Sequence, residues 1–187
     1  YQGLYGGSEL PGVLRSSPGA HEFLIATGYR AIDQVVVLQR DLAGFRPPVD
    51  RRAISLRRRV STVVTADPVG RTWWEACTRS SLDVTRYELL LAETGRVTAA
   101  LTTVALHALS TTWGVTAAGI VEFAVEPEYR RQGHGLLLLS DVLKQLAQER
   151  MGLVEVQTMV HNTAARNLYQ KFGFQPIDEG VVYRRER

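Results

Sequence analysis

The chain has 187 residues, of which 45% are hydrophobic, so it can bury one hydrophobic core with a partial second unit. Its formal net charge is +3, it contains no apolar run near the roughly 18 residues of a membrane span, and its N-terminal residues lack a signal-peptide pattern. The single cysteine, Cys77, excludes an internal disulfide and fits a reducing compartment, so we expect a cytoplasmic protein with this thiol buried beside Trp73 and Trp74.

The basic charge comes almost entirely from arginine and is densest at Arg51–Arg52 and Arg57–Arg59. Arginine binds phosphate well, so a nucleic-acid surface is one interpretation. No aromatic residues are interleaved with this cluster, as a base-stacking surface would need. The cluster fits better as the solvated face of a strand, and nucleic acid is not the expected partner.

In chain order, the first boundary lies around residues 41–50, where Gly44, Pro47 and Pro48 predict a linker. Before it we expect a helix over 20–27 and a strand over 35–38. After it we expect strands over 53–65, 120–125, 154–159 and 181–183, and a hairpin of strands over 87–92 and 97–106 with its turn at Glu93–Gly95. We expect helices over 72–79, 136–151 and 163–172, and a loop over 109–117. The 136–151 helix is indicated by the periodic spacing of Leu136, Leu139, Leu143 and Leu146. This alternation predicts an α/β fold, with a central mixed sheet covered by helices on both faces.

Two segments of the chain resemble each other. Ala20, Phe23–Leu24 and Gly28–Tyr29 have the same spacing as Ala165, Leu168–Tyr169 and Gly173–Phe174. The first copy has Ser17 and Leu24 where the second has Asn162 and Tyr169, so it lacks both polar groups. We interpret residues 1–45 as the remnant of a duplicated unit and residues 46–187 as the main domain.

The segment Arg130-x-x-Gly133-x-Gly135 follows a strand and opens a leucine-rich helix. Glycines allow close approach of the backbone to a ligand, and the amides that open a helix favour an anion. A good helix cap is an equally simple explanation. The segment is neither a P-loop nor a complete three-glycine dinucleotide fingerprint.

Asn162 and Tyr169 belong to the later helix, seven positions apart on nearly the same face. Asn162 suits either a helix cap or a ligand contact. Tyr169 suits either a half-buried packing role or a phenol that donates a proton. Gly173 then ends the helix.

From Ala53 to the C-terminus, these residues resemble the GNAT superfamily of acyl-CoA-dependent N-acyltransferases. The specific matches are Val125-x-Pro127-x-Tyr129-Arg130-Arg131-x-Gly133-x-Gly135 and Asn162-x-x-Ala165-x-x-Leu168-Tyr169-x-x-x-Gly173-Phe174. The upstream repeat resembles the tail of a second, degenerate GNAT unit, as in tandem members of the superfamily.

The resemblance implies acetyl-CoA as co-substrate and no metal. Tyr169 would protonate the departing thiolate, and Asn162 would contact the pantetheine arm. The strand Phe123–Ala124–Val125 would pair with the pantetheine. Arg130 and Arg131 would add cations beside the pyrophosphate, which the amides of Gln132, Gly133, His134, Gly135 and Leu136 would cradle.

The general base has three candidates. Glu122 is the leading candidate because it interrupts an apolar strand beside the expected acyl site. Glu155 is another candidate, ordered water is a third, and the His134 side chain would instead face phosphate.

Three functions stay open: an N-acetyltransferase acting on a primary amine of a small molecule, peptide or protein, a non-catalytic acyl-CoA-binding regulatory module, and an arginine-rich nucleic-acid-binding module. The acceptor pocket would involve residues 72–79 and the 109–117 loop, and the upstream segment is a further candidate. Trp73, Trp74 and Trp113 are candidate walls of this pocket. We expect no membrane partner. We expect residues 1–45 to dock against the main domain, to pack in a homodimer, or to pack against a tandem domain.

Overall fold

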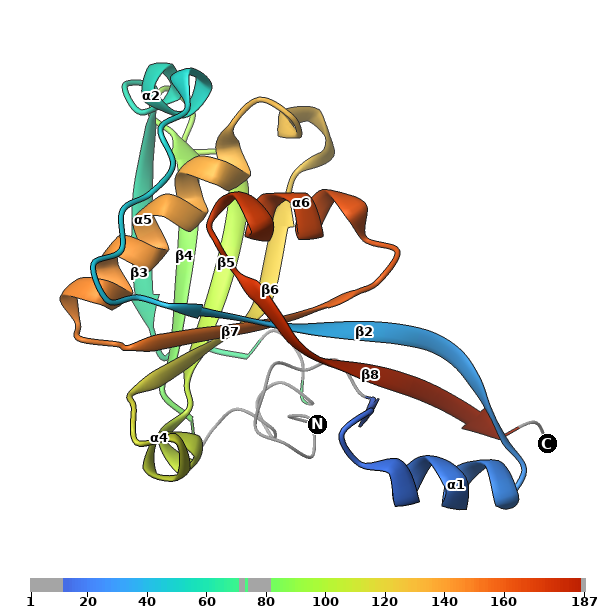
Figure 1. Cartoon of the computed structure of the whole chain (residues 1–187). Helices are drawn as coiled ribbons and strands as arrows, with labels where there is room; N and C mark the ends of the chain where they lie inside the picture. Colours follow the sequence, from blue (N-terminus) through green and yellow to red (C-terminus); the bar gives the residue numbers. More distant parts are fainter. Residues whose placement is uncertain (1–11, 71–72, 74–81, 186–187) are drawn as a thin grey trace. The chain divides into compact units, whose positions relative to one another are not determined.

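The computed structural model of the chain describes residues 12–70, 73 and 82–185 (Figure 1). The chain forms two compact units. The central unit is Asp41–Val154, and the terminal unit combines Tyr1–Arg40 with Glu155–Arg187. Helices are interspersed among the strands in the described residues, so the predicted α/β class is confirmed.

The central unit contains an antiparallel sheet in the order β6-β5-β4-β3. The predicted hairpin is confirmed: Leu90 pairs with Val97, and Gly95 adopts a left-handed φ of 67° in the turn. The strands are β3 (Val60–Ala66), β4 (Val84–Leu91), β5 (Val97–Ala105) and β6 (Ala117–Val125).

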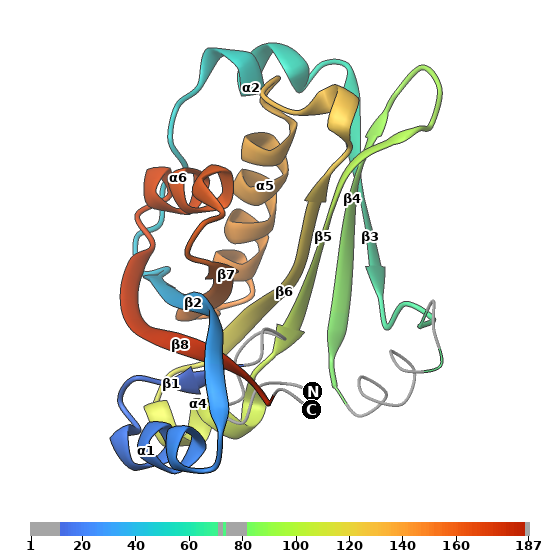
Figure 2. The same cartoon turned by 90° about the vertical axis from the view of Figure 1, so that its right-hand side faces the viewer.

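Helix α5 (His134–Gln148) covers one face of this sheet, where it packs on β4, β5 and β6 (Figure 2). Its buried face includes Leu138, Leu139 and Leu143, all fully excluded from solvent. Each such side chain stabilises the fold by about 1.5–3 kcal/mol relative to an exposed one. The helix indicated by the leucine spacing is therefore confirmed, and its leucines form part of the core of the central unit.

Two sequence predictions for this unit were wrong. The expected strand over 53–65 begins as helix α2 (Arg51–Leu56), because Asp50 caps the amides of Arg52 and Ala53; strand β3 follows. The expected loop over 109–117 contains helix α4 (His107–Trp113), which ends at Gly114 with a left-handed φ. The predicted helix over 72–79, with Trp74 and Cys77, lies outside the described residues apart from Trp73, which is exposed.

The terminal unit joins strands from both ends of the chain, in the order β1-β8-β2-β7. Its inner strand β2 pairs antiparallel with β8, and the two strands run side by side in Figure 1. The upstream segment therefore docks on the C-terminal strand of the same chain. The elements are β1 (Val13–Leu14), α1 (Pro18–Ala26), β2 (Tyr29–Asp41), β7 (Leu153–Met159), α6 (Thr163–Lys171) and β8 (Gln175–Arg185).

The buried part of β2 is the predicted strand Val35–Leu38, each residue of which is at most 7% exposed. A continuous apolar run is expected for a strand that is buried on both faces. Among the described residues, no helix has the length and apolarity to cross a bilayer.

Candidate functional site

The loop between β6 and α5 turns sharply before the helix begins. After the 3-10 turn η1 (Pro127–Tyr129), Arg131 and Gly133 adopt left-handed φ values of 59° and 97°. Gly133 is the N-cap of α5, and no side chain caps it. The first helical bond runs from Leu137 N to Gly133 O at 2.9 Å. The preceding amides, His134 to Leu136, are therefore those that a helix N-terminus offers to an anion.

Gly133 is required by the packing of this loop. A Cβ atom there would lie 3.2 Å from both Ala53 N and Arg52 Cβ, on helix α2. Arg52 also donates a 3.1 Å hydrogen bond to the Arg131 carbonyl. Helix α2, which the sequence did not predict, thus fixes the backbone of the loop.

Two arginine side chains of the loop are exposed at its surface. Arg130 is exposed and its Nε donates a 3.0 Å bond to Val125 O, and Arg131 is also exposed. Gln132 donates from its amide to Glu128 O. Positive charge and helix amides thus occur in one loop of the central unit, a combination that suits a phosphate group.

The sequence predicted that the His134 side chain faces phosphate, and this prediction is wrong. The imidazole is 3% exposed, its Nδ1 lies 2.8 Å from Thr98 Oγ1, and its ring contacts Tyr129. Burial, with a contribution from Arg59, lowers the pKa of His134. Only its backbone amide remains a candidate for anion binding.

Strand β6 carries the three residues expected to pair with pantetheine. On one edge Phe123, Ala124 and Val125 pair with Leu101, Ala100 and Ala99 of β5. The register shifts between Thr102 and Thr103, so Val121 forms a bulge immediately before Glu122. Bulges re-aim neighbouring side chains and are frequent next to active sites.

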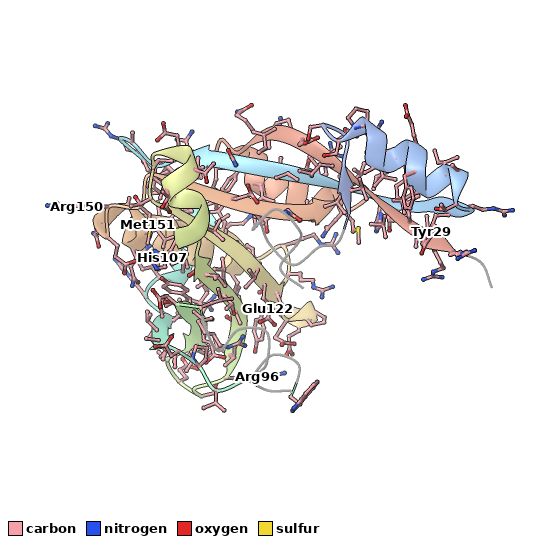
Figure 3. All side chains as sticks on the ribbon, turned by 90° about the horizontal axis from the view of Figure 1, so that it is seen from below. Tyr29, Arg96, His107, Glu122, Arg150 and Met151 are labelled. Carbon is pink, nitrogen blue, oxygen red and sulfur yellow. The ribbon has the colours of Figure 1, made fainter. Side chains whose placement is uncertain are left out.

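Glu122, which is labelled in Figure 3, is held in a charge cluster on three neighbouring strands. Its Oε2 accepts bonds from Arg86 at 3.0 Å and from Thr102 at 3.3 Å. Arg86 also bonds Glu88 Oε1 at 3.0 Å, so one guanidinium is shared by two carboxylates. Sequence reasoning missed Arg86, because the register that aligns it with Glu122 is not visible in the spacing of the chain.

The terminal unit carries the other two polar groups. Asn162 caps α6, since its Oδ1 accepts a 3.2 Å bond from Ala165 N, as one of the two sequence interpretations predicted. Tyr169 is 4% exposed, and its ring lies 5.4 Å from that of Phe174. Burial raises the pKa of the Tyr169 phenol, so it carries its proton at neutral pH.

Glu155, the second candidate for the general base, is a buried carboxylate. It is 4% exposed, and Gln39 of β2 donates a 2.8 Å bond to its Oε2. Burial raises the pKa of Glu155, and hydrogen bonds from Gln39 and Gln157 partly oppose this effect. A perturbed buried carboxylate is a functional candidate by its chemistry.

A family comparison decides the broad assignment. The model of the acetyltransferase (GNAT) family matches residues 66–174, more than half of the chain. The chain belongs to the GNAT acetyltransferase family. Members of this family transfer acyl groups from acyl-CoA. In the described ranges no cluster of three or more His, Cys, Asp or Glu side chains is arranged to hold a metal ion.

Solved structures share the GNAT fold with this chain. A tandem GNAT protein from the clavulanic acid biosynthesis pathway is 16% identical, with a TM-score of 0.65, over 94% of this chain and 61% of that one. A GCN5-related N-acetyltransferase from Sphaerobacter thermophilus is 16% identical, with a TM-score of 0.64, over 92% and 57%. A GCN5-related N-acetyltransferase from Kribbella flavida is 16% identical, with a TM-score of 0.59, over 91% and 65%.

The chain thus spans less than two thirds of the length of these GNAT relatives. At these identities the likeness extends to the fold alone. Comparison with curated protein sequences gives no match.

Proposed function

We propose that this chain is an acetyl-CoA-dependent N-acetyltransferase that acts by direct attack of a primary amine on the thioester. The observation that carries the proposal is the loop before α5. There Arg131 and Gly133 adopt left-handed backbone conformations, and no side chain caps the helix that follows. Such a loop, with two exposed arginines, has the donors that a CoA pyrophosphate needs.

The proposed binding roles follow from this chemistry. The amides of residues 132–136 bind the pyrophosphate, with Arg130 and Arg131 as neighbouring cations. The backbone of Phe123–Val125 binds the pantetheine, and the amide group of Asn162 is a further contact. Because Asn162 Oδ1 already caps α6, its contribution to a ligand is the NH₂ group.

In the proposed reaction the amine nitrogen forms a bond to the acetyl carbonyl carbon and the carbon–sulfur bond breaks. A carboxylate accepts the proton that the amine loses, and the Tyr169 phenol gives its proton to the CoA thiolate. Glu122 is the first candidate for the base. Glu155 is the second, supported by the raised pKa of its carboxyl.

One observation favours the alternative, a non-catalytic acyl-CoA-binding module. The Glu122 carboxylate is bonded by Arg86 and Thr102, which occupies it with an ion pair. The nucleic-acid alternative is weaker, because Arg57 of the arginine cluster is paired with Asp141 at 2.6 Å.

The test combines ligand binding with turnover. We expect CoA and acetyl-CoA, but not duplex DNA, to raise the melting temperature, because a ligand that binds only the native state stabilises it. Release of free thiol from acetyl-CoA in a screen of amine acceptors then separates enzyme from sensor. Binding without thiol release on any amine supports the sensor, and stabilisation only by DNA, lost at high salt, overturns both CoA assignments.

A further inference from the structure

The terminal unit contains the same helix–strand element twice. Each residue of the α1–β2 element corresponds to the residue 145 positions later in α6–β8, as Pro18 corresponds to Thr163 and Ala26 to Lys171. Both helices therefore have nine residues and follow a polar N-cap, Ser17 or Asn162. Each helix is followed by a glycine with left-handed φ, 85° at Gly28 and 75° at Gly173.

The equivalence extends to irregularities of the two strands. The β2–β8 register shifts twice, once at Ile32 and once at Ile177, which are equivalent positions. Both isoleucines are exposed, by 49% and 53%. The next residues, Asp33 and Asp178, each accept a 2.7 Å bond on Oδ1 from the following backbone amide. Shared bulges and shared local bonds are much more specific than a shared helix length.

The two copies are related by a local two-fold axis. Val35 pairs with Gly180, and these two residues are equivalent to each other under the 145-residue correspondence. Moving outward, Gln34 pairs with Val181 and Val36 with Glu179, and these two pairs exchange under the equivalence. Outside the bulges, Ala31–Tyr183 and Leu38–Pro176 exchange in the same way. Reciprocal pairing of this kind is the property of an isologous contact between two like units.

We infer that β2 is the last strand of a second GNAT-type unit, the rest of which lies upstream of Tyr1 in the same polypeptide. The β2–β8 pair is then the interface between that upstream unit and the GNAT domain of this chain. Strand β8 directly follows the residues 66–174 that match the GNAT family, and the two-fold axis assigns the equivalent place to β2. The inference rests on the family and the register, and it is independent of the proposed acetyl transfer.

Helix α1 supplies the surface on which that unit would pack. His21 anchors it within the terminal unit, through bonds of 2.8 Å to the Tyr183 hydroxyl and the Leu14 carbonyl. No residue of α1 is buried, and Phe23 and Ile25 are 65% and 64% exposed. In α6, by contrast, Tyr169 is buried, whereas its α1 equivalent Leu24 is not. The apolar side chains of α1 thus lack cover within the described part of the chain.

We propose that the upstream unit covers the exposed apolar side chains of α1, and the tandem GNAT relative supports this choice. That protein aligns with 94% of this chain over 61% of its own length, more than one half of a tandem protein. Such an overlap is expected when a chain contains one complete unit and the end of another.

The test begins with the natural gene, in which codons upstream of Tyr1 should encode a GNAT-type unit that runs in frame into α1. In the natural full-length protein, Phe23→Lys should lower the melting temperature by about 4 °C or more, because it places a charge in a buried contact. In the 187-residue chain the same change should have little effect. Glu22→Lys, on an exposed neighbour in α1, is the matched control and should be tolerated in both.

Two results would overturn the inference. One is a natural gene without such an upstream unit. The other is equal tolerance of Phe23→Lys and Glu22→Lys in the full-length protein. If the 187-residue chain is instead a dimer in sedimentation, and Phe23→Lys makes it monomeric, then a second copy of this chain is the occupant and the upstream-unit inference is wrong.

Discussion

The side-chain amide of Gln39, on β2, donates a 2.8 Å hydrogen bond to the carboxylate of Glu155, on β7. The N-terminal segment therefore contributes a polar contact to one of the two candidate bases of this GNAT domain. Because Glu155 is almost fully buried, this bond partly offsets the cost of removing its charge from water.

The buried carboxyl of Glu155 should make stability depend on pH. Burial raises the pKa of the Glu155 carboxyl in the folded state. As pH rises, this carboxyl therefore loses its proton at a lower pH in the unfolded chain than in the folded protein. The Glu155 carboxyl therefore leaves stability unchanged below about pH 4, the ordinary glutamate range, and its destabilising effect grows as pH rises from there through the folded pKa. Relative to wild type, Glu155→Gln should become progressively more stable as pH increases above about 4, and the difference should level off above the folded pKa.

Urea unfolding of both proteins at several pH values measures this difference. Glu93→Gln, in an exposed turn, is the control and should give a constant difference. A constant difference for Glu155→Gln as well would show that its carboxyl titrates normally.

Tyr169→Phe should lower kcat by roughly 10²-fold, the usual scale for loss of a general acid. The raised pKa of the phenol keeps the proton available, so the loss should persist across neutral pH. Affinity for CoA, followed by the thermal shift, should stay near wild type because the ring is retained. Tyr29→Phe removes a hydroxyl from another tyrosine of the terminal unit and should leave kcat unchanged. Unaltered turnover of Tyr169→Phe at saturating acetyl-CoA would remove this residue from the mechanism.

The sequence predicted those elements that depend on local signals. Leucine periodicity gave α5, and the turn around Gly95 gave the β4–β5 hairpin. The start of the 53–65 strand was wrong because one side chain, Asp50, caps a helix in a segment that also suits a strand. Local propensity cannot decide such a segment when a cap and the packing on α5 favour the helix.

For the candidate site, the sequence predicted residues but not their contacts. Glu122 was chosen because it interrupts an apolar strand, yet its pairing with Arg86 depends on the register of three strands and on the bulge at Val121. His134 was placed near phosphate by its neighbours in sequence, whereas its side chain turns into the core toward Thr98. Register and side-chain direction are tertiary properties, so spacing alone could not reveal them.

Replacement of Glu122 separates catalysis from ion pairing. If Glu122 is the base, Glu122→Gln should lower turnover, most strongly at low pH, where the amine is most often protonated. Glu88→Gln is the matched control, because it removes the other carboxylate bonded to Arg86 and keeps Glu122. Equal losses in the two variants would indicate that the cluster is structural. A flat pH response of Glu122→Gln would direct attention to Glu155 or to an ordered water.

Replacement of Gly135 tests the anion site more cleanly than replacement of Gly133. Any side chain at Gly133 meets helix α2 and a φ of 97°, so the variant would be destabilised with or without ligand. Gly135 lies in the first turn of α5, where an aspartate is tolerated by the helix dipole. We expect Gly135→Asp to keep the melting temperature of the free protein and to abolish the shift caused by CoA, because its charge repels the pyrophosphate.

Gly135→Asn has nearly the same size without the charge, so it should keep more of the CoA shift than Gly135→Asp. If both variants lose the shift equally, the site excludes side chains by size alone. If Gly135→Asp responds to CoA like wild type, the amides that open α5 do not bind the pyrophosphate, and the cofactor assignment for residues 132–136 fails.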